Sequence, residues 1–338
     1  MHGTLLLGYV GDGALPGVTE RDARQLTHIN IAFGHVGRDG LLSTDGLTHL
    51  SELERIRKAN PEIKIVLSIG GWGAGGFSTM ARTAQGRAAF ARSCADFADK
   101  EKLDGIDLDW EYPCDNSAGI DSSPDDLKNF TLLLQALRDA LGKNRIVSIA
   151  AGGGADYLDG IETPKVSNIC DYIQIMTYDL RSGFCRIAGH HTAPFPSQND
   201  TSGRDTSSAV ERFVRAGADA ERIVIGAAMY SRQWKGVPDV NNGLFQHAES
   251  IGNYGPGYTE LCDRFIGKNG WKRFWDDAAQ APYLFNGSEL ISYDDENSVE
   301  AKCRYIRDRG LLGLMYWEHS CDPSRKLLQK MAECLGRV

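Results

Sequence analysis

Three acidic side chains at alternating positions give this sequence its strongest chemical signal. Asp107, Asp109 and Glu111 lie in the segment 103–113, LDGIDLDWEYP, with apolar residues between them. On a β-strand, residues two apart share a face and lie about 6.6 Å from each other, so the three carboxyl groups would form a row. Because several buried like charges are unfavourable, at least one acid must hold a proton, which drives the pKa values apart. The alternative, an exposed acidic edge, is disfavoured by the intervening apolar residues.

The remaining sequence predicts the elements that would position this row. Short apolar runs predict strands at 5–10, 28–34, 64–70, 103–111, 145–151, 171–179, 222–230 and 311–317. Most are continuous rather than alternating, as in parallel strands buried on both faces. Amphipathic stretches predict helices at 125–141, 47–59, 87–100, 207–216, 298–309 and 326–335. This alternation predicts an α/β fold, a (β/α)8 TIM barrel, with an open doubly wound sheet as the alternative.

The position of the acids along the fourth predicted strand separates their roles. Active sites of such barrels lie at the C-terminal ends of the strands, where Glu111 stands. Glu111 is also the longest of the three acids, so it should reach farthest toward a substrate. Asp104 has the opposite strand parity, so we expect it to have a structural role.

One interval is too long for a single barrel helix. Between the seventh and eighth predicted strands, residues 236–287 are rich in Gly, Asn, Tyr, Trp and Asp and contain short strand-like pieces. We interpret 236–287 as a small inserted α+β domain beside the mouth of the barrel. The catalytic barrel would then comprise 1–235 and 288–338.

Several motifs together resemble glycoside hydrolase family 18, the chitinase family. The acidic segment matches the family's D-x-x-D-x-D-x-E motif at every position. Segments that resemble the motifs of other strands follow in order: SIGG at 68–71, MTYD at 176–179, YSRQW at 230–234 and MYWE at 315–318. Ser231 stands where the family pattern has glycine. The predicted insertion is similar to the family's chitinase insertion domain, and the resemblance covers nearly the whole chain.

The resemblance implies a retaining reaction in which the substrate supplies the nucleophile. Glu111 would protonate the leaving oxygen while the sugar's own 2-acetamido oxygen attacks the anomeric carbon, and Glu111 would then act as base on water. Asp109 would orient the acetamide N–H, and Asp107 would hold Asp109 in place or share its proton. Tyr178 would donate a hydrogen bond to the acetamide oxygen.

Aromatic and polar residues near the strand ends are the candidates for sugar binding, because the apolar face of a pyranose packs on an aromatic ring. By resemblance, Trp317 forms the floor under the cleaved sugar. The substrate-binding candidates are Tyr9, Phe33, Gly71, Trp72, Tyr112, Met176, Asp179, Tyr230, Arg232 and Trp317. The alternatives are that the aromatic rings fill the core and that Asp179 and Arg232 form a plain surface ion pair. Their position at strand ends favours sugar contact for Trp72 and Trp317.

Composition limits the other classes of function. The net charge of −8 over 338 residues argues against nucleic acid as a partner, and the longest apolar runs are too short to span a membrane. The lone G-x-G-x-x-G match at 71–76 and the spacing of Cys185, His190 and His191 are weak signals for a nucleotide and a metal. We expect no cofactor. The eight cysteines suit buried thiols or disulfides.

These observations predict a chitinase that acts on chitin or its oligomers as a monomer. The alternatives are a lectin of the same fold without catalysis, and an endo-β-N-acetylglucosaminidase or peptidoglycan hydrolase of the same family. The lectin is disfavoured because Glu111, Asp109 and Tyr178 are all present. A chitin degrader is expected outside the cell, although the N-terminal residues have no cleavable signal pattern.

Overall fold

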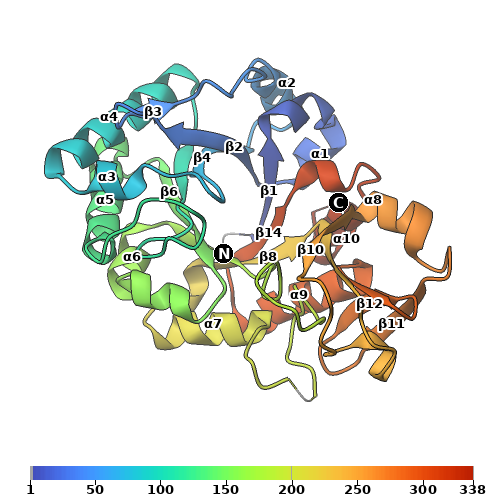
Figure 1. The fold of residues 1–338 in the computed structure, drawn as a ribbon. Helices are drawn as coiled ribbons and strands as arrows, with labels where there is room; N and C mark the ends of the chain where they lie inside the picture. The colour runs from blue at the N-terminus through green and yellow to red at the C-terminus, as the bar shows by residue number, and fades with distance from the viewer. Residues whose placement is uncertain (1–2, 199, 338) are drawn as a thin grey trace.

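A computed structural model of the protein describes residues 3–198 and 200–337. Eight parallel strands form a ring in the hydrogen-bonded order β1-β14-β8-β7-β6-β5-β4-β2, and the pairing of β1 with β2 closes it (Figure 1). Their bounds are β1 Leu5–Gly11, β2 His28–Val36, β4 Lys64–Gly70, β5 Gly105–Asp109, β6 Ile146–Gly152, β7 Tyr172–Met176, β8 Ile223–Ala228 and β14 Gly313–Trp317. The closed ring confirms the predicted (β/α)8 barrel and excludes the open sheet.

The helices surround the ring and cover its outer face (Figure 1). They are α1 Glu20–Gln25, α2 Glu52–Ala59, α3 Phe77–Ala81, α4 Ala84–Lys100, α5 Asp126–Leu141, α6 Thr163–Ile169, α7 Thr206–Arg215, α9 Glu296–Arg309 and α10 Lys326–Cys334. The short helix α8, Tyr258–Glu260, lies instead in the segment that contains the second sheet described below. On α5, the apolar stripe Phe130, Leu134, Leu137 and Leu141 is buried against the strands, as its period predicts. The short helices α1 and α6 were not predicted, because each is too short to show a periodic pattern.

Successive side chains of a barrel strand point to opposite faces, and the two faces belong to two different layers of the core. On β5, Ile106 and Leu108 belong to the core between strands and helices. Asp107 and Asp109, on the other face of the same strand, are buried as well. This parity is the one predicted for the acidic row. The structure ends β5 at Asp109, so Glu111 lies just beyond the strand rather than on it.

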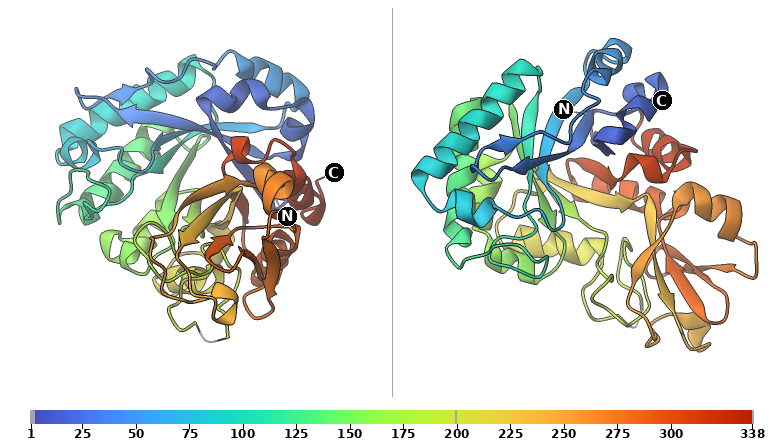
Figure 2. Two further views of the ribbon diagram at one scale, coloured as in Figure 1. Left: turned by 45° about the vertical axis from the view of Figure 1, so that its right-hand side comes forward. Right: turned by 45° about the horizontal axis from the view of Figure 1, so that its top comes forward.

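A second sheet lies beside the barrel (Figure 2). Its antiparallel strands have the order β10-β9-β13-β12-β11, with bounds β9 Tyr230–Lys235, β10 Asn253–Gly257, β11 Lys272–Asp276, β12 Ala281–Phe285 and β13 Glu289–Ser292. The sheet therefore extends beyond the predicted interval 236–287 at both ends. The predicted barrel includes residues 230–235, because the motif at 230–234 resembles one of the seventh barrel strand, but the structure pairs these residues with β10 and β13.

The long loop after β7 is attached to this second sheet. Backbone hydrogen bonds of 2.9 and 2.8 Å join Ala188 to Gln246 and Phe245, and the indole Nε1 of Trp234 donates to the Cys185 carbonyl at 2.9 Å. The loop and the sheet thus form one wall beside the mouth of the barrel. Within the described ranges, no helix has both the length and the apolar character needed to cross a membrane.

Candidate active site

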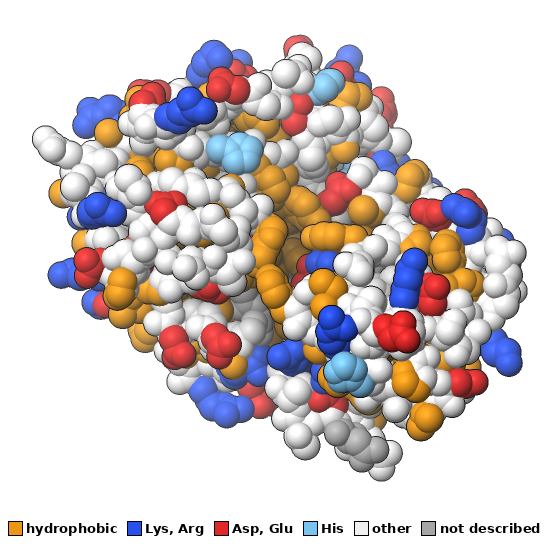
Figure 3. All heavy atoms as spheres, viewed as in Figure 1, with side chains coloured by type: hydrophobic (Ala, Val, Ile, Leu, Met, Phe, Trp, Pro, Cys, Tyr) orange, Lys and Arg blue, Asp and Glu red, His pale blue; other side chains and the backbone are white. Residues whose placement is uncertain are grey.

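A cavity of about 890 Å³ opens at the C-terminal ends of the barrel strands. Figure 3 shows this face, with hydrophobic side chains lining a hollow between the barrel and the second sheet. All predicted site residues except Asp107 and Gly71 line it, namely Tyr9, Phe33, Trp72, Asp109, Glu111, Tyr112, Met176, Tyr178, Asp179, Tyr230, Arg232 and Trp317. The fold therefore brings together residues from both ends of the sequence.

Asp107 lies below the cavity, where four donors surround its carboxyl group. Oδ2 accepts hydrogen bonds from the Tyr9 hydroxyl at 2.8 Å and the Ser68 hydroxyl at 2.7 Å. Oδ1 accepts from the Ser148 hydroxyl at 2.7 Å and from Nε2 of Gln174 at 2.9 Å. Burial raises the pKa of Asp107, while the four donors favour its ionised form. Both oxygens are thus occupied by side chains of β1, β4, β6 and β7.

Asp109 has the opposite environment, two residues along the same strand. It is buried and lines the cavity, yet its Oδ1 has no hydrogen-bond partner among the described residues. Burial and the nearby charges of Glu111 and Asp107 raise the pKa of Asp109 well above its usual range. Burial and neighbouring charge therefore favour the protonated form of Asp109. Asp107 influences Asp109 through its charge and not through a hydrogen bond, because both Asp107 oxygens already accept hydrogen bonds from other residues.

Gly71 supports the end of β5 instead of lining the cavity. Its N–H donates to the Asp109 carbonyl at 2.9 Å, and its φ of +93° suits glycine. A Cβ at this position would lie 2.9 Å from the Phe33 ring. Glycine is thus required here by backbone conformation and close packing.

Glu111 stands where the cavity begins above β5. Burial raises its pKa to about 7, a hydrogen bond from Tyr112 opposes the rise, and the charge of Asp179 adds to it. A carboxyl group with this pKa is protonated in about half of the molecules at neutral pH, so it can both donate and accept a proton there. General acid–base catalysis near neutral pH requires this property.

The Tyr178 hydroxyl is placed by packing on the far side of the cavity. Its ring lies against Tyr230 with centroids 6.1 Å apart, and its hydroxyl is 3.7 Å from Sδ of Met315. Burial, with the charges of Asp109 and Glu111, raises the pKa of Tyr178 well above its usual range. The hydroxyl therefore keeps its proton and serves as a donor.

Asp179 and Arg232 form an ion pair in the cavity wall rather than on the outer surface. Nε and Nη2 of Arg232 lie 2.6 and 2.5 Å from the two Asp179 oxygens, a bidentate geometry. Nδ1 of the buried His191 lies 3.4 Å from Asp179 Oδ1. Burial opposes ionisation of Asp179, but hydrogen bonds from His191 and Arg232 outweigh it and lower the pKa of Asp179 to about 2.

The floor of the cavity is aromatic. The Trp317 ring stacks on Phe33 with centroids 5.4 Å apart and planes inclined by 21°, and Tyr9 lies 5.8 Å from it. Trp317 also lines the cavity. A flat aromatic platform therefore lies in the same cavity as the acids.

Comparison with known proteins identifies the family to which this arrangement belongs. The family described as glycosyl hydrolases family 18 matches residues 6–322. The chain belongs to glycosyl hydrolases family 18. This confirms the family indicated by the sequence motifs and, with it, the class of glycoside hydrolases.

Individual relatives in family 18 agree with this assignment. Chitinase A1 of Niallia circulans is 36% identical over 309 residues, 84% of this chain and 44% of that protein. Chitotriosidase-1 of Mus musculus is 29% identical, over 89% of this chain and 68% of that protein. The solved structure of a family 18 N-acetylglucosaminidase from Paenibacillus barengoltzii superposes with a TM-score of 0.96 at 46% identity, covering 98% of this chain and 99% of that one. The chain thus spans less than half the length of the bacterial chitinase.

Two exposed aromatic residues of this family 18 chain escaped the sequence analysis. Phe184 is 76% exposed and Tyr254 is 67% exposed, and both line the cavity with Trp72, which is 51% exposed. Trp72 and Phe184 approach to 5.8 Å between centroids, and the Arg232 guanidinium lies 3.7 Å from the centre of the Tyr254 ring. Phe184 lies in an irregular segment and Tyr254 in the Gly- and Pro-containing strand β10 (NYGPG), so only their aromatic character could have marked them.

The weaker sequence signals have structural explanations in this family 18 fold. Cys185 caps the Trp234 indole through its carbonyl, His190 contacts Asp276 at 3.2 Å, and His191 contacts Asp179. Across the described ranges, no group of three His, Cys, Asp or Glu side chains is placed to hold a metal ion. All eight cysteines are free thiols.

Proposed function

We propose that the protein hydrolyses β-1,4-linked N-acetylglucosamine chains with retention of configuration, using the substrate's acetamido group as nucleophile. One observation carries this proposal: Glu111, with a pKa of about 7, lines the same cavity as Asp109, which has a raised pKa and an unpaired oxygen. Two carboxyl groups that both favour protonation suit proton donation and hydrogen bonding. Neither is poised as an ionised nucleophile.

In the first step, Glu111 donates its proton to the glycosidic oxygen while the C1–O bond breaks. The acetamide oxygen of the same sugar forms a bond to C1 and gives an oxazolinium ion. Asp109 accepts a hydrogen bond from the acetamide N–H, and the Tyr178 hydroxyl donates to the acetamide oxygen. In the second step, ionised Glu111 takes a proton from water as the water opens the ring, which restores the configuration at C1.

The substrate class is supported by the aromatic surfaces and by the relatives. Trp317 at the floor and Trp72, Phe184 and Tyr254 at the rim offer separate faces for consecutive sugars. The relatives are named as chitinases and, for the solved structure, an N-acetylglucosaminidase. Chitin oligomers are therefore the first substrates to test, with N-glycoprotein and peptidoglycan fragments as the competing ones.

The decisive experiment compares wild type with Glu111→Gln on a chitin tetramer. The amide keeps the shape but has no proton to donate, so turnover should fall by about 10² to 10⁴-fold while tetramer binding persists. Glu62→Gln, an exposed residue at the opposite end of the barrel, is the matched control and should retain wild-type turnover.

Two results would overturn the proposal. One is near-normal hydrolysis by Glu111→Gln. The other is efficient cleavage of a fully de-N-acetylated tetramer, which has no acetamide oxygen to attack C1. Incubation with N-glycoprotein and peptidoglycan fragments, read by mass spectrometry, separates the alternative substrates.

A further inference from the structure

A completely buried ion pair lies outside the cavity, where the second sheet rejoins the barrel. Lys302 on α9 and Asp294, between β13 and α9, have exposed side-chain fractions of 0% and 1%, and Lys302 Nζ lies 2.7 Å from Asp294 Oδ2. Buried charges are unfavourable unless they are paired and hydrogen-bonded. The proposed catalytic steps use neither residue, so the position of this pair requires its own explanation.

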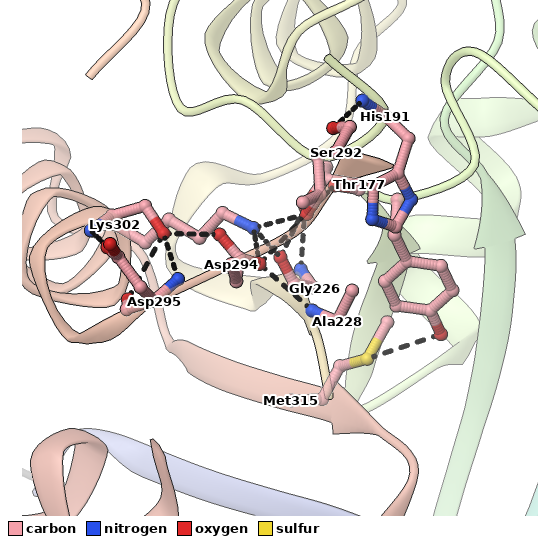
Figure 4. A network of polar contacts seen from close by, with 12 residues as sticks. Thr177, His191, Gly226, Ala228, Ser292, Asp294, Asp295, Lys302 and Met315 are labelled. Atoms are coloured by element: carbon pink, nitrogen blue, oxygen red, sulfur yellow. Dashed lines mark hydrogen bonds and ion pairs between the residues drawn. The ribbon is translucent and has the colours of Figure 1, made fainter. Parts of the chain in front are cut away.

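The ammonium group of Lys302 also donates hydrogen bonds to the barrel and to the loop after β7. Nζ donates to Thr192 Oγ1 at 2.6 Å and to the Gly226 carbonyl at 3.0 Å. Asp294 Oδ2 also accepts from the N–H of Ala228 at 3.0 Å. The pair therefore forms hydrogen bonds with two backbone groups of β8, the Gly226 carbonyl and the Ala228 N–H, as Figure 4 shows.

The same network reaches the residue that precedes Tyr178. Thr177 Oγ1 donates to the Gly226 carbonyl and accepts from the Gly226 N–H, both at 2.8 Å. The Thr192 hydroxyl donates to the Thr177 carbonyl at 3.1 Å. Thr177, Gly226 and Lys302 thus share hydrogen bonds at the end of β7 (Figure 4).

The ring of Tyr178 rests on the backbone that Lys302 holds. A Cβ placed on Gly226 would lie only 2.8 Å from Cε1 of Tyr178, so the ring packs directly on the Gly226 backbone. Lys302 therefore contacts the carbonyl of Gly226, while Tyr178 packs against its Cα. A shift of Gly226 would move the hydroxyl of Tyr178 within the cavity.

We infer that the Lys302–Asp294 pair is a positioning element that fixes the Tyr178 hydroxyl at the site of the acetamide oxygen, by holding Gly226 and Thr177. This inference rests on the proposed function, in which Tyr178 is a hydrogen-bond donor in the reaction. A pair that only joined the second sheet to the barrel would affect stability and not the turnover of folded protein.

The test is a double-mutant cycle of Lys302→Met and Tyr178→Phe on a chitin tetramer, with kcat expressed per folded molecule. Lys302→Met alone should lower kcat by about 10- to 100-fold, with KM changing by less than about threefold. In the Tyr178→Phe background, the same change should have little further effect, because the hydroxyl that it displaces is already absent. Arg138→Met, which breaks the Arg138–Asp171 pair near the other end of β7, is the control and should lower stability without lowering kcat.

A milder pair of variants keeps the inference testable if Lys302→Met does not fold. Thr192→Val has the shape of threonine but cannot accept from Lys302, whereas Thr192→Ser retains the hydroxyl. The valine variant should lower kcat and the serine variant should restore it. The inference would be overturned by an unchanged kcat in folded Lys302→Met or Thr192→Val. It would also be overturned if the fold-losses in kcat of Lys302→Met and Tyr178→Phe were independent, so that the double variant showed their full product. Full activity of Tyr178→Phe alone would instead contradict the role of Tyr178 in the proposed function.

Discussion

Asp107 in the barrel interior and Phe184 in the cavity wall are held in opposite ways. Four side-chain donors from four strands fix the Asp107 carboxyl group at 2.7–2.9 Å. Phe184 is 76% exposed and meets Trp72 across a centroid distance of 5.8 Å. Under the proposed function, the difference corresponds to a division of labour, in which the interior fixes the geometry of the reacting groups and the wall supplies contacts for the sugar chain.

After that of Glu111→Gln, the largest expected effect is at the centre, for Asp109→Asn. Unlike the carboxyl group, an asparagine cannot ionise as the positive oxazolinium ion of the proposed reaction forms, so kcat should fall by about 10² to 10³-fold while tetramer binding falls much less. Steady-state kinetics and calorimetric titration measure the two quantities. Asp104→Asn, just before the same strand, should keep its kcat. Equal losses of kcat and binding in Asp109→Asn would remove the contrast between centre and wall.

The next effect is on stability, for Ser148→Ala beneath the cavity. It removes one of the four donors to Asp107, so the free energy of unfolding should fall by about 1.5–3 kcal/mol, the range for a hydrogen bond to a charged group. Chemical denaturation followed by circular dichroism gives this value, with the exposed Ser122→Ala as a control. Equal stability of the two variants would show that the interior tolerates the loss of a donor.

A smaller effect is expected at the wall, for Phe184→Ala. Losing one aromatic surface should raise KM for a hexamer by about 2- to 10-fold, because an aromatic contact contributes about 0.5–1.5 kcal/mol. The melting temperature and kcat should stay the same, since the ring is exposed, and Phe184→Tyr should retain wild-type KM. A lower melting temperature in Phe184→Ala would show that Phe184, like the interior residues, contributes to stability.

The smallest effect concerns how the wall influences the acid at the centre. The protonated form of Glu111 is lost as the pH rises through its pKa of about 7, so kcat/KM should fall about tenfold per unit on the alkaline side. The charge of Asp179 helps to raise this pKa, so Asp179→Asn should move the alkaline limb slightly to lower pH. A pH profile of kcat/KM measures the midpoint, and a shift to higher pH would contradict this electrostatic contribution.

The acidic row shows how much of the site the sequence could predict. The alternation of Asp107, Asp109 and Glu111 is a local property of one strand, and it was enough to assign the faces of Asp107 and Asp109. The four partners of Asp107 are between 39 and 98 residues away in the chain. No local pattern specifies such pairings, because they depend on how the closed barrel brings its strands together.

The boundary between barrel and second sheet shows where local patterns fail. Residues 222–235 form one β-prone stretch, but the structure divides it between β8 and β9, which belong to different sheets. Phe184 and Tyr254 were missed for a related reason, since neither the irregular segment around Phe184 nor the short sequence NYGPG of β10 has a period to analyse. Lys302 was not predicted as a buried residue, because a lysine on an amphipathic helix usually faces solvent.

The chain leaves the barrel for the second sheet through β9 and returns to it through β13, and these two strands are neighbours. β9 directly follows β8, β13 directly precedes α9, and the two pair in an antiparallel ladder from Arg232–Ser292 to Lys235–Glu289. This ladder works like a closed stem, so residues added or removed at the far hairpins do not change the distance that the barrel has to bridge. Changes in the height of the side wall therefore leave the eight-stranded ring as it is.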